Sequence, residues 1–208
     1  MKLSVVIPFY NEENMIQKMY DELVKEINQI TKAEFEIIFI NDGSKDRTFE
    51  RMLAIAAGDS RVKYISFSRN FGKEAGTIAG LEYATGEAVI LMDGDLQHPP
   101  AMLPQMIEAY EQGYDVVSAR RTRTGEKPHR TFLAKHFYKL ANKMMDIELM
   151  DGVSEFRLFS RKVVNAIISM QEYNRFSKGI FAWIGFNEKV IEYENQVRTV
   201  GETKYSLK

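Results

Sequence analysis

"ILMDGDLQHPP", residues 90–100, joins an apolar run to a polar stretch that contains two aspartates. The apolar part has the length and composition of a buried strand, and Gly94 permits the chain to turn where that strand ends. Side chains two residues apart in a strand point the same way, so Asp93 and Asp95 can share a face. The stretch therefore predicts a buried strand that ends in a pair of carboxylates.

Apolar, β-branched runs of strand length recur along the chain, at Leu3–Phe9, Phe35–Ile40, Val62–Phe67, Ala88–Met92 and Val116–Ser118. Apolar residues at helical spacing lie between them, at 15–27, 49–56 and 102–110, and a further helix is expected over 131–145 within a less regular remainder. Strands that alternate with helices predict an α/β fold, with a mostly parallel central sheet and helices on both faces. We expect a single domain over residues 1–208.

The composition excludes several classes of protein. The 208 residues include 28 Lys and Arg against 29 Asp and Glu, so the net charge of −1 gives no reason to expect a nucleic-acid partner. The absence of cysteine excludes disulfides, thiolate catalysis and Cys-based zinc sites, and it favours a reducing compartment. No window approaches the ~18 apolar residues of a membrane span, so we expect a soluble chain.

The ends of the five expected strands are polar. They read "PFYNEEN", "NDGSKD", "SRNFGKE", "MDGDLQHPP" and "ARRTRTG". Each loop taken alone also fits ordinary turn and helix-capping chemistry. In an open parallel sheet, however, ligands bind beyond the carboxyl ends of the strands. Because all five loops meet on that one edge, we expect a ligand site there.

The two aspartates point to a metal. Asp93 and Asp95 repel each other unless they share a proton or a divalent cation, and their hard oxygens, with the carbonyl of Gln97, suit Mg²⁺ or Mn²⁺. Such a metal most simply bridges two phosphates, which predicts a nucleotide-diphosphate donor and group transfer. The loop of Asp42 can then hold the base or ribose. Lys73 is a candidate contact for donor phosphate or sugar, and a solvated surface lysine is the alternative.

Three glycines, Gly72, Gly76 and Gly80, are spaced by four residues. On a helix they form one bare stripe that can pack tightly against a sheet. They do not make the G-x-G-x-x-G pattern of a dinucleotide fold, so a nicotinamide cofactor is excluded.

The segments "VVIPFYNEE", "INDGSKD", "SRNFGKEAGTIAGL" and "LMDGDLQHPP" resemble glycosyltransferase family 2, and more closely the branch that moves a sugar from a nucleotide onto a polyprenyl phosphate. The resemblance implies a nucleotide-sugar (GT-A) fold, inversion at the anomeric carbon and a divalent cation at the Asp-x-Asp. It implies a nucleotide-sugar-binding half over residues 1–119 and an acceptor-binding half over 120–208. It places the nucleoside at Pro8, Tyr10, Glu12 and Asp42, and the metal and diphosphate at Asp93, Asp95 and Gln97. Asn11 and Lys73 complete the expected donor site.

A basic segment follows the fifth strand, with Arg120, Arg121, Arg123, Lys127, His129 and Arg130. Arginine forks suit phosphate, although a mobile, solvated loop is the alternative. The resemblance implies that this segment meets the acceptor phosphate, with Arg120 and Arg130 as the best candidates and Gly125 and Pro128 making it a lid.

The segment "DGVSEFRLFSRKVV" stands where relatives read Gly-Asp-Phe-Arg, whose aspartate is the suspected catalytic base. Glu155 takes that place here, and Asp151 and Asp95 are further catalytic candidates. A phosphate monoester is largely dianionic at neutral pH, so such an acceptor scarcely needs a base. Glu155 can instead orient Arg157 or the acceptor, or form a structural ion pair; Arg157 is itself a candidate contact of the acceptor phosphate.

The last segments also resemble this branch, in which Arg198, Gly201 and Lys204 lie at the membrane-facing edge. Because the family usually continues into two membrane helices, we expect a shortened form of a protein that works at the cytoplasmic face of the cell membrane; a naturally short relative is the alternative. The apolar residues of 176–186 either dock on the bilayer surface or pack in the core. A homo-oligomer is expected only for the full-length form.

The leading hypothesis is metal-dependent, inverting transfer of a hexose, glucose or N-acetylglucosamine, from a UDP-sugar to undecaprenyl phosphate. One alternative is a mannosyltransferase that uses GDP-mannose. More remote alternatives are an inactive nucleotide-sugar or lipid-binding module and a haloacid-dehalogenase-like phosphatase. The phosphatase is disfavoured because its aspartate pair stands near the N-terminus and is followed by residues unlike the Leu96 and Gln97 found here.

Overall fold

The computed structural model describes residues 1–122, 153–170 and 177–193, apart from the side chain of Lys178. Its strands are β1 (Lys2–Phe9), β2 (Glu34–Asn41), β3 (Val62–Ser66), β4 (Ala88–Leu91), β5 (Val116–Arg121), β6 (Val153–Ser160) and β7 (Glu188–Tyr193). Its helices are α1 (Ile16–Ile27), α2 (Thr48–Gly58), α3 (Lys73–Tyr83), α4 (Leu103–Glu111), α6 (Arg161–Ser169) and α7 (Ser177–Trp183), with a 3₁₀ turn, η1 (Pro100–Met102), before α4.

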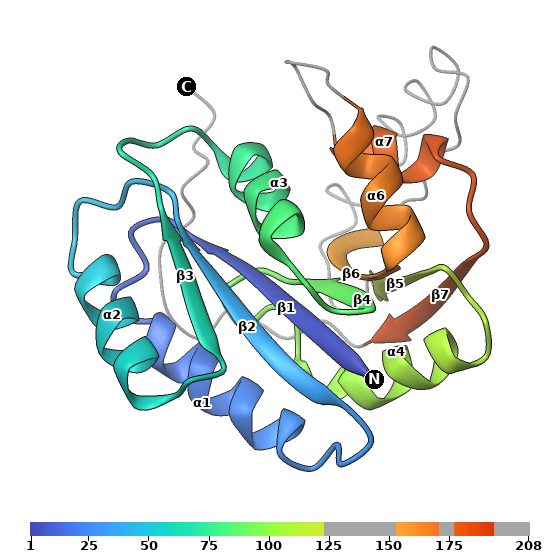
Figure 1. Ribbon diagram of the computed structural model, residues 1–208, viewed down its shortest axis with the longest axis horizontal. Helices are drawn as coiled ribbons and strands as arrows, with labels where there is room; N and C mark the ends of the chain where they lie inside the picture. Colours follow the sequence, from blue (N-terminus) through green and yellow to red (C-terminus); the bar gives the residue numbers. More distant parts are fainter. Residues whose placement is uncertain (123–152, 171–176, 194–208) are drawn as a thin grey trace.

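The strands form one seven-stranded sheet in the order β3-β2-β1-β4-β6-β5-β7 (Figure 1). Neighbouring strands run parallel except at β6, which is antiparallel to both β4 and β5. The prediction of a mostly parallel sheet is confirmed, and each of the five expected strands is present. The expected helix over 131–145 lies outside the described residues.

Helices cover both faces of the sheet (Figure 1). Side chains alternate along each strand, so Val5 joins a core cluster with α1, α2 and α4, while its neighbour Val6 joins a second cluster with α3, α6 and α7. Both faces of the central strands are therefore buried, which explains why their sequences are continuous apolar runs rather than alternating ones.

Helix α3 lies close against the sheet. A Cβ at Gly80 would stand 2.2 Å from Cγ1 of Val6, whereas one at Gly76 would meet Ile40 at an ordinary 3.5 Å. The expected close packing of the glycine stripe is thus confirmed most strongly at Gly80. Gly72 precedes the helix with a φ of +95°.

Strands β6 and β7 are not among the strands expected from the sequence. Strand β6 inserts between β4 and β5, and β7 extends the sheet beside β5. Strands from both expected halves of the chain therefore share one sheet, and residue 119 lies inside β5. Because β6 runs antiparallel, its first residues lie at the edge where the parallel strands end, and this places Glu155 there.

The apolar residues around α7 pack mainly in the core. The ring of Phe181 is 4% exposed and lies 4.9 Å from that of Phe159, measured between centroids. Ile180, Ile184 and Phe186 pack partly buried on the same cluster, while Trp183 is 64% exposed. Of the two alternatives for this segment, core packing thus accounts for most of its described residues.

Across the described ranges, no helix combines the length and the apolar character needed to cross a membrane.

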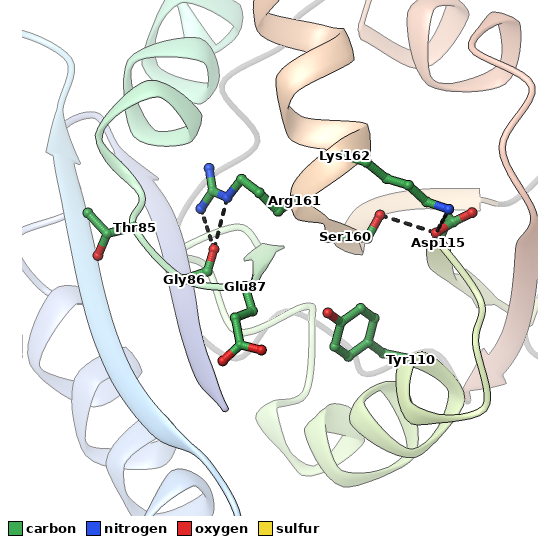
Figure 2. A pocket seen from close by; sticks show the side chains of 8 residues that line it. All are labelled: Thr85, Gly86, Glu87, Tyr110, Asp115, Ser160, Arg161 and Lys162. Atoms are coloured by element: carbon green, nitrogen blue, oxygen red, sulfur yellow. Dashed lines mark hydrogen bonds and ion pairs between the residues drawn. The ribbon is translucent and has the colours of Figure 1, made fainter.

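A pocket of about 510 Å³ opens at the amino-terminal edge of the sheet, away from the Asp-x-Asp turn (Figure 2). Arg161, the first residue of α6, donates hydrogen bonds to the carbonyl oxygens of Ala84 and Gly86 at the end of α3. Lys162 pairs with Asp115 at 2.7 Å. Because these charged side chains bind other groups of the protein, we assign the pocket a structural role, at the place where α3, α6 and β5 contact one another.

Glu36 anchors this edge from within the sheet. Its carboxylate, 4% exposed, accepts hydrogen bonds from Ser4 Oγ at 2.6 Å, Lys63 Nζ at 2.8 Å and both Thr85 N and Oγ1, and it pairs with Lys2 at 3.4 Å. Burial alone would raise the pKa of Glu36, but the hydrogen bonds from Lys63, Ser4 and Thr85 outweigh it and lower the pKa from 4.5 to about 2.

We expect Glu36→Gln to lower the free energy of unfolding by about 3 kcal/mol at pH 7, since the pKa of Glu36 is lowered from 4.5 to about 2 and one pKa unit corresponds to ~1.4 kcal/mol. The folded pKa lies below the ordinary value, so this stabilisation is present above about pH 4.5 and is lost as the pH falls toward about 2. Urea unfolding of both proteins from pH 7 to pH 3 measures it. A gap that stays constant over this range would contradict the assignment; Glu34→Gln, on the exposed start of the same strand, is the control.

Candidate active site

Hydrogen bonds fasten the loop after β1 to the loop after β2. Asn11 has a φ of +51°, donates its N–H to Ser44 Oγ at 3.0 Å and accepts from the N–H of Lys45 at 2.8 Å. The N–H of Glu12 donates to Thr48 Oγ1 at 2.8 Å. The structure thus brings two predicted donor-site residues, Asn11 and Glu12, onto a loop that β2 and α2 hold in place.

A pocket of about 520 Å³ lies beside these loops, at the carboxyl ends of β1, β2 and β3. Its lining includes the predicted Tyr10, and also Asn41, Gly43, Ser44, Lys45, Phe49, Ser66, Phe67, Ser68, Arg69 and Asn70. The latter were not singled out from the sequence, although the polar ends of β2 and β3 were the available signal. Gly43 permits the loop after β2 to approach the loop after β3 closely: its φ is +62°, and a Cβ there would lie 2.2 Å from the backbone of Arg69.

Asp42 lies behind this pocket and is 3% exposed. Its two carboxylate oxygens accept hydrogen bonds from the N–H groups of Phe71 at 2.7 Å and Gly72 at 3.0 Å. In this arrangement Asp42 fixes the entry to α3, and its contact with a nucleoside stays a prediction. Pro8 packs on the same helix, since a Cβ at Gly76 would stand 3.6 Å from the Pro8 ring.

The Asp-x-Asp turn is held by two local hydrogen bonds. Leu96 takes a φ of +59°, and the N–H of Gln97 donates to Asp95 Oδ1 at 3.1 Å. The N–H of Asp93 donates to Nδ1 of His98 at 3.0 Å. This bond requires the neutral imidazole to carry its proton on Nε2.

His98 is buried, with its ring stacked on Phe156 at 5.4 Å between centroids. Burial lowers the pKa of His98, although Asp93 and Asp95 nearby act to raise it. His98 was not among the metal ligands expected from the sequence. Its position instead makes it a support of the turn that carries the two aspartates.

Glu155 faces Asp93 across the β4–β6 pair. Leu91 pairs with Arg157, so two residues further along these antiparallel strands Asp93 comes opposite Glu155. The ammonium of Lys73 lies between the two carboxylates, 2.5 Å from Asp93 Oδ1 and 2.7 Å from Glu155 Oε2. Burial alone would lower the pKa of Lys73, but the two carboxylates outweigh it and raise the pKa above its ordinary value.

Two predicted phosphate contacts are engaged in ion pairs. Arg157 is 5% exposed, pairs with Glu188 at 3.3 Å and places its guanidinium 5.2 Å from the centroid of Phe181. Its Nε has no hydrogen-bond partner among the described residues. Arg120 is more accessible and donates from Nε to Glu192 on β7 at 3.0 Å. The contacts of both arginines with an acceptor stay predictions, as do those of Arg130, Arg198 and Lys204 and the catalytic role of Asp151, and these four residues lie outside the described ranges.

The chemistry of the turn fits a divalent cation shared with a ligand. Within the described ranges, no group of three or more His, Cys, Asp or Glu side chains gathers closely enough to hold a metal by itself. Asp93, Asp95 and Gln97 supply hard oxygens from one short turn. Mg²⁺ is typically held by one or two carboxylates together with substrate phosphates, and this set of oxygens fits that mode.

The α/β sheet, with a pocket and an Asp-x-Asp turn at its carboxyl edge, has the GT-A fold of glycosyltransferases. The chain belongs to glycosyl transferase family 2, whose family model matches residues 4–168. The family predicted from the sequence motifs is thereby confirmed.

Relatives extend over nearly the whole chain. "Putative glycosyltransferase CsbB" of Bacillus subtilis (strain 168) is 50% identical over 205 residues, which are 99% of this chain and 62% of that protein. "Prophage bactoprenol glucosyl transferase homolog" of Escherichia coli (strain K12) is 43% identical over 99% of this chain and 67% of its own length. The chain thus spans somewhat under two thirds of the length of the first of these relatives.

The fold also matches a solved enzyme structure. Glucosyl-3-phosphoglycerate synthase from Mycobacterium tuberculosis, in complex with Mn²⁺, UDP-glucose and phosphoglyceric acid, has a TM-score of 0.59 and 20% sequence identity, over 97% of this chain and 73% of that one. At this identity the likeness establishes the fold.

We expect His98→Phe to lower the free energy of unfolding by about 1–3 kcal/mol, because phenylalanine keeps the stacking on Phe156 but leaves the partly buried N–H of Asp93 without this acceptor. His98→Asn restores an acceptor near Nδ1 and should recover part of that loss, despite its smaller volume. Chemical denaturation of the three proteins at pH 7 measures the order. A His98→Phe protein as stable as the wild type would show that the hydrogen bond contributes nothing.

Proposed function

We propose that this chain carries out inverting transfer of a hexose, glucose or N-acetylglucosamine, from a UDP-sugar to undecaprenyl phosphate. The observation that carries the proposal is the meeting of Asp93, Lys73 and Glu155 at the same edge of the sheet as the pocket lined by Tyr10. Similarity to a bactoprenol glucosyl transferase homologue supports a polyprenyl phosphate as acceptor.

The donor binds across the carboxyl edge of β1, β2 and β4. Its nucleoside occupies the pocket beside Tyr10, and its diphosphate extends toward Asp93 and Asp95. Asp93, Asp95 and Gln97 would hold Mg²⁺ or Mn²⁺, and the bound cation would offset the negative charge of the leaving diphosphate. The ammonium of Lys73 adds a fixed positive charge on the same side of the site.

The acceptor attacks from the side of Glu155. An oxygen of its phosphate forms a bond to the anomeric carbon while the bond from that carbon to the diphosphate oxygen breaks, so UDP leaves and the configuration inverts. Glu155, 18% exposed, is placed to accept a proton or to orient the phosphate. Arg120 and the basic residues beyond it, Arg130, Arg198 and Lys204, bind the acceptor phosphate at the cytoplasmic face of the membrane.

The direct test is transfer of radiolabelled sugar to short-chain polyprenyl phosphate, with UDP-glucose, UDP-N-acetylglucosamine and GDP-mannose each supplied with Mg²⁺ or Mn²⁺. We expect transfer from a UDP-sugar, and a loss of at least about 100-fold in Asp95→Asn because the metal site loses a charged ligand. Asp21→Asn, on the exposed face of α1, is the control. Transfer from GDP-mannose alone would favour the mannosyltransferase, and donor binding without any turnover would favour a non-catalytic module.

A second assay separates the two roles of Glu155. If its carboxylate accepts a proton, Glu155→Gln lowers kcat by about 100-fold or more with little change in donor affinity, and Glu155→Asp retains more activity. Single-turnover rates and UDP-sugar titrations give the two quantities. Unchanged turnover in Glu155→Gln would rule out a catalytic base at this position and leave the orienting role.

A further inference from the structure

Lys73 occupies a position that helix stability does not explain. It is the first residue of α3, where the helix dipole disfavours a positive charge. Glu74 supplies the acidic residue expected in this first turn. The ammonium of Lys73 is compensated by Asp93, in the turn after β4, and by Glu155 of β6, which lie 2.5 and 2.7 Å away.

The two carboxylates would repel each other without this ammonium. The β4–β6 register brings Asp93 and Glu155 opposite each other, and Lys73 places one positive charge between two negative ones. The three side chains remain open to solvent, at 39% for Lys73, 29% for Asp93 and 18% for Glu155. A ligand can therefore reach the cluster without unfolding it.

A divalent cation and Lys73 need the same carboxylate. Oδ1 of Asp93 is the oxygen that contacts the ammonium, and a cation bound at the Asp-x-Asp would draw on that group as well. The ammonium and a divalent cation at one carboxylate repel each other, so the presence of either one makes binding of the other to Asp93 less favourable.

We propose that Lys73 is the internal counter-ion of the donor-free site. It positions Asp93 and Glu155 next to each other and competes with a divalent cation for Asp93. The inference rests on the proposed function, because it takes Asp93 as a metal ligand. It assigns to Lys73 a positioning role that is distinct from direct contact with the donor.

The test is titration of the whole chain with Mn²⁺, followed by the paramagnetic resonance of the free ion, at pH 7 and constant ionic strength. Lys73→Met should bind Mn²⁺ about fivefold to tenfold more tightly than the wild type, because the competing charge is gone. Lys73→Arg keeps the charge and should stay within about twofold of the wild type. Lys18→Met removes an exposed lysine of α1 and should change nothing.

A gain in Mn²⁺ affinity distinguishes competition by Lys73 from distortion of the site by the substitution, because a distorted site would bind Mn²⁺ more weakly. Equal or weaker binding in a folded Lys73→Met protein, judged by far-UV circular dichroism, overturns the inference while leaving the metal site intact. If neither protein binds Mn²⁺, with or without UDP, the metal site of the proposed function fails as well.

A second variant keeps the test decisive if Lys73→Met folds but is too unstable for the Mn²⁺ titration. Glu155→Gln removes one of the two carboxylates, so Lys73→Met in that background should be less destabilising than in the wild type. Thermal unfolding without metal measures this coupling, and an equal effect in both backgrounds overturns the counter-ion role.

Discussion

The pairing of β4 with β6 is the constraint on which the site depends. The parallel strands bring polar loops to one edge of the sheet, but parallel strands alone would leave Lys73 and Asp93 without the carboxylate of Glu155 beside them. An antiparallel strand begins where its neighbours end. Its register with β4 sets Glu155 opposite Asp93, although these residues are far apart in sequence. Residues from two separate segments thereby become one cluster.

Ion-pair clusters lie at opposite edges of the sheet, with one carboxylate between two lysines at Glu36 and one lysine between two carboxylates at Lys73, and the two clusters differ in exposure. Glu36 is almost wholly buried, receives hydrogen bonds from Ser4, Lys63 and Thr85, and has its pKa lowered to about 2. The cluster of Lys73, Asp93 and Glu155 is partly open to solvent. A fully satisfied, buried carboxylate holds the fold together, whereas an open cluster can exchange its internal cation for a ligand.

The elements predicted well are those whose pattern is local. The first strands are continuous apolar runs, because both faces of the sheet are covered, and helical spacing marked α1, α2 and α4. Strand β6 escaped prediction because Glu155 and Arg157 interrupt its apolar pattern, and their burial depends on Lys73 and Glu188 from elsewhere in the chain. The residues around α7 were ambiguous for the same kind of reason. Apolar residues that pack against Phe159 in the core have the composition of a membrane-docking segment.

By itself the sequence determined the order of strands and helices, the polar strand ends and the family, because each is written in residues that lie close together along the chain. Only the tertiary structure decided which of those residues meet. Sequence reasoning treated Lys73 as a donor contact or a solvated lysine, and Glu155 as a base or a partner of Arg157. Their meeting at Asp93 follows from where α3 packs and from the direction in which β6 runs. Those are properties of the assembled sheet, and no local pattern encodes them.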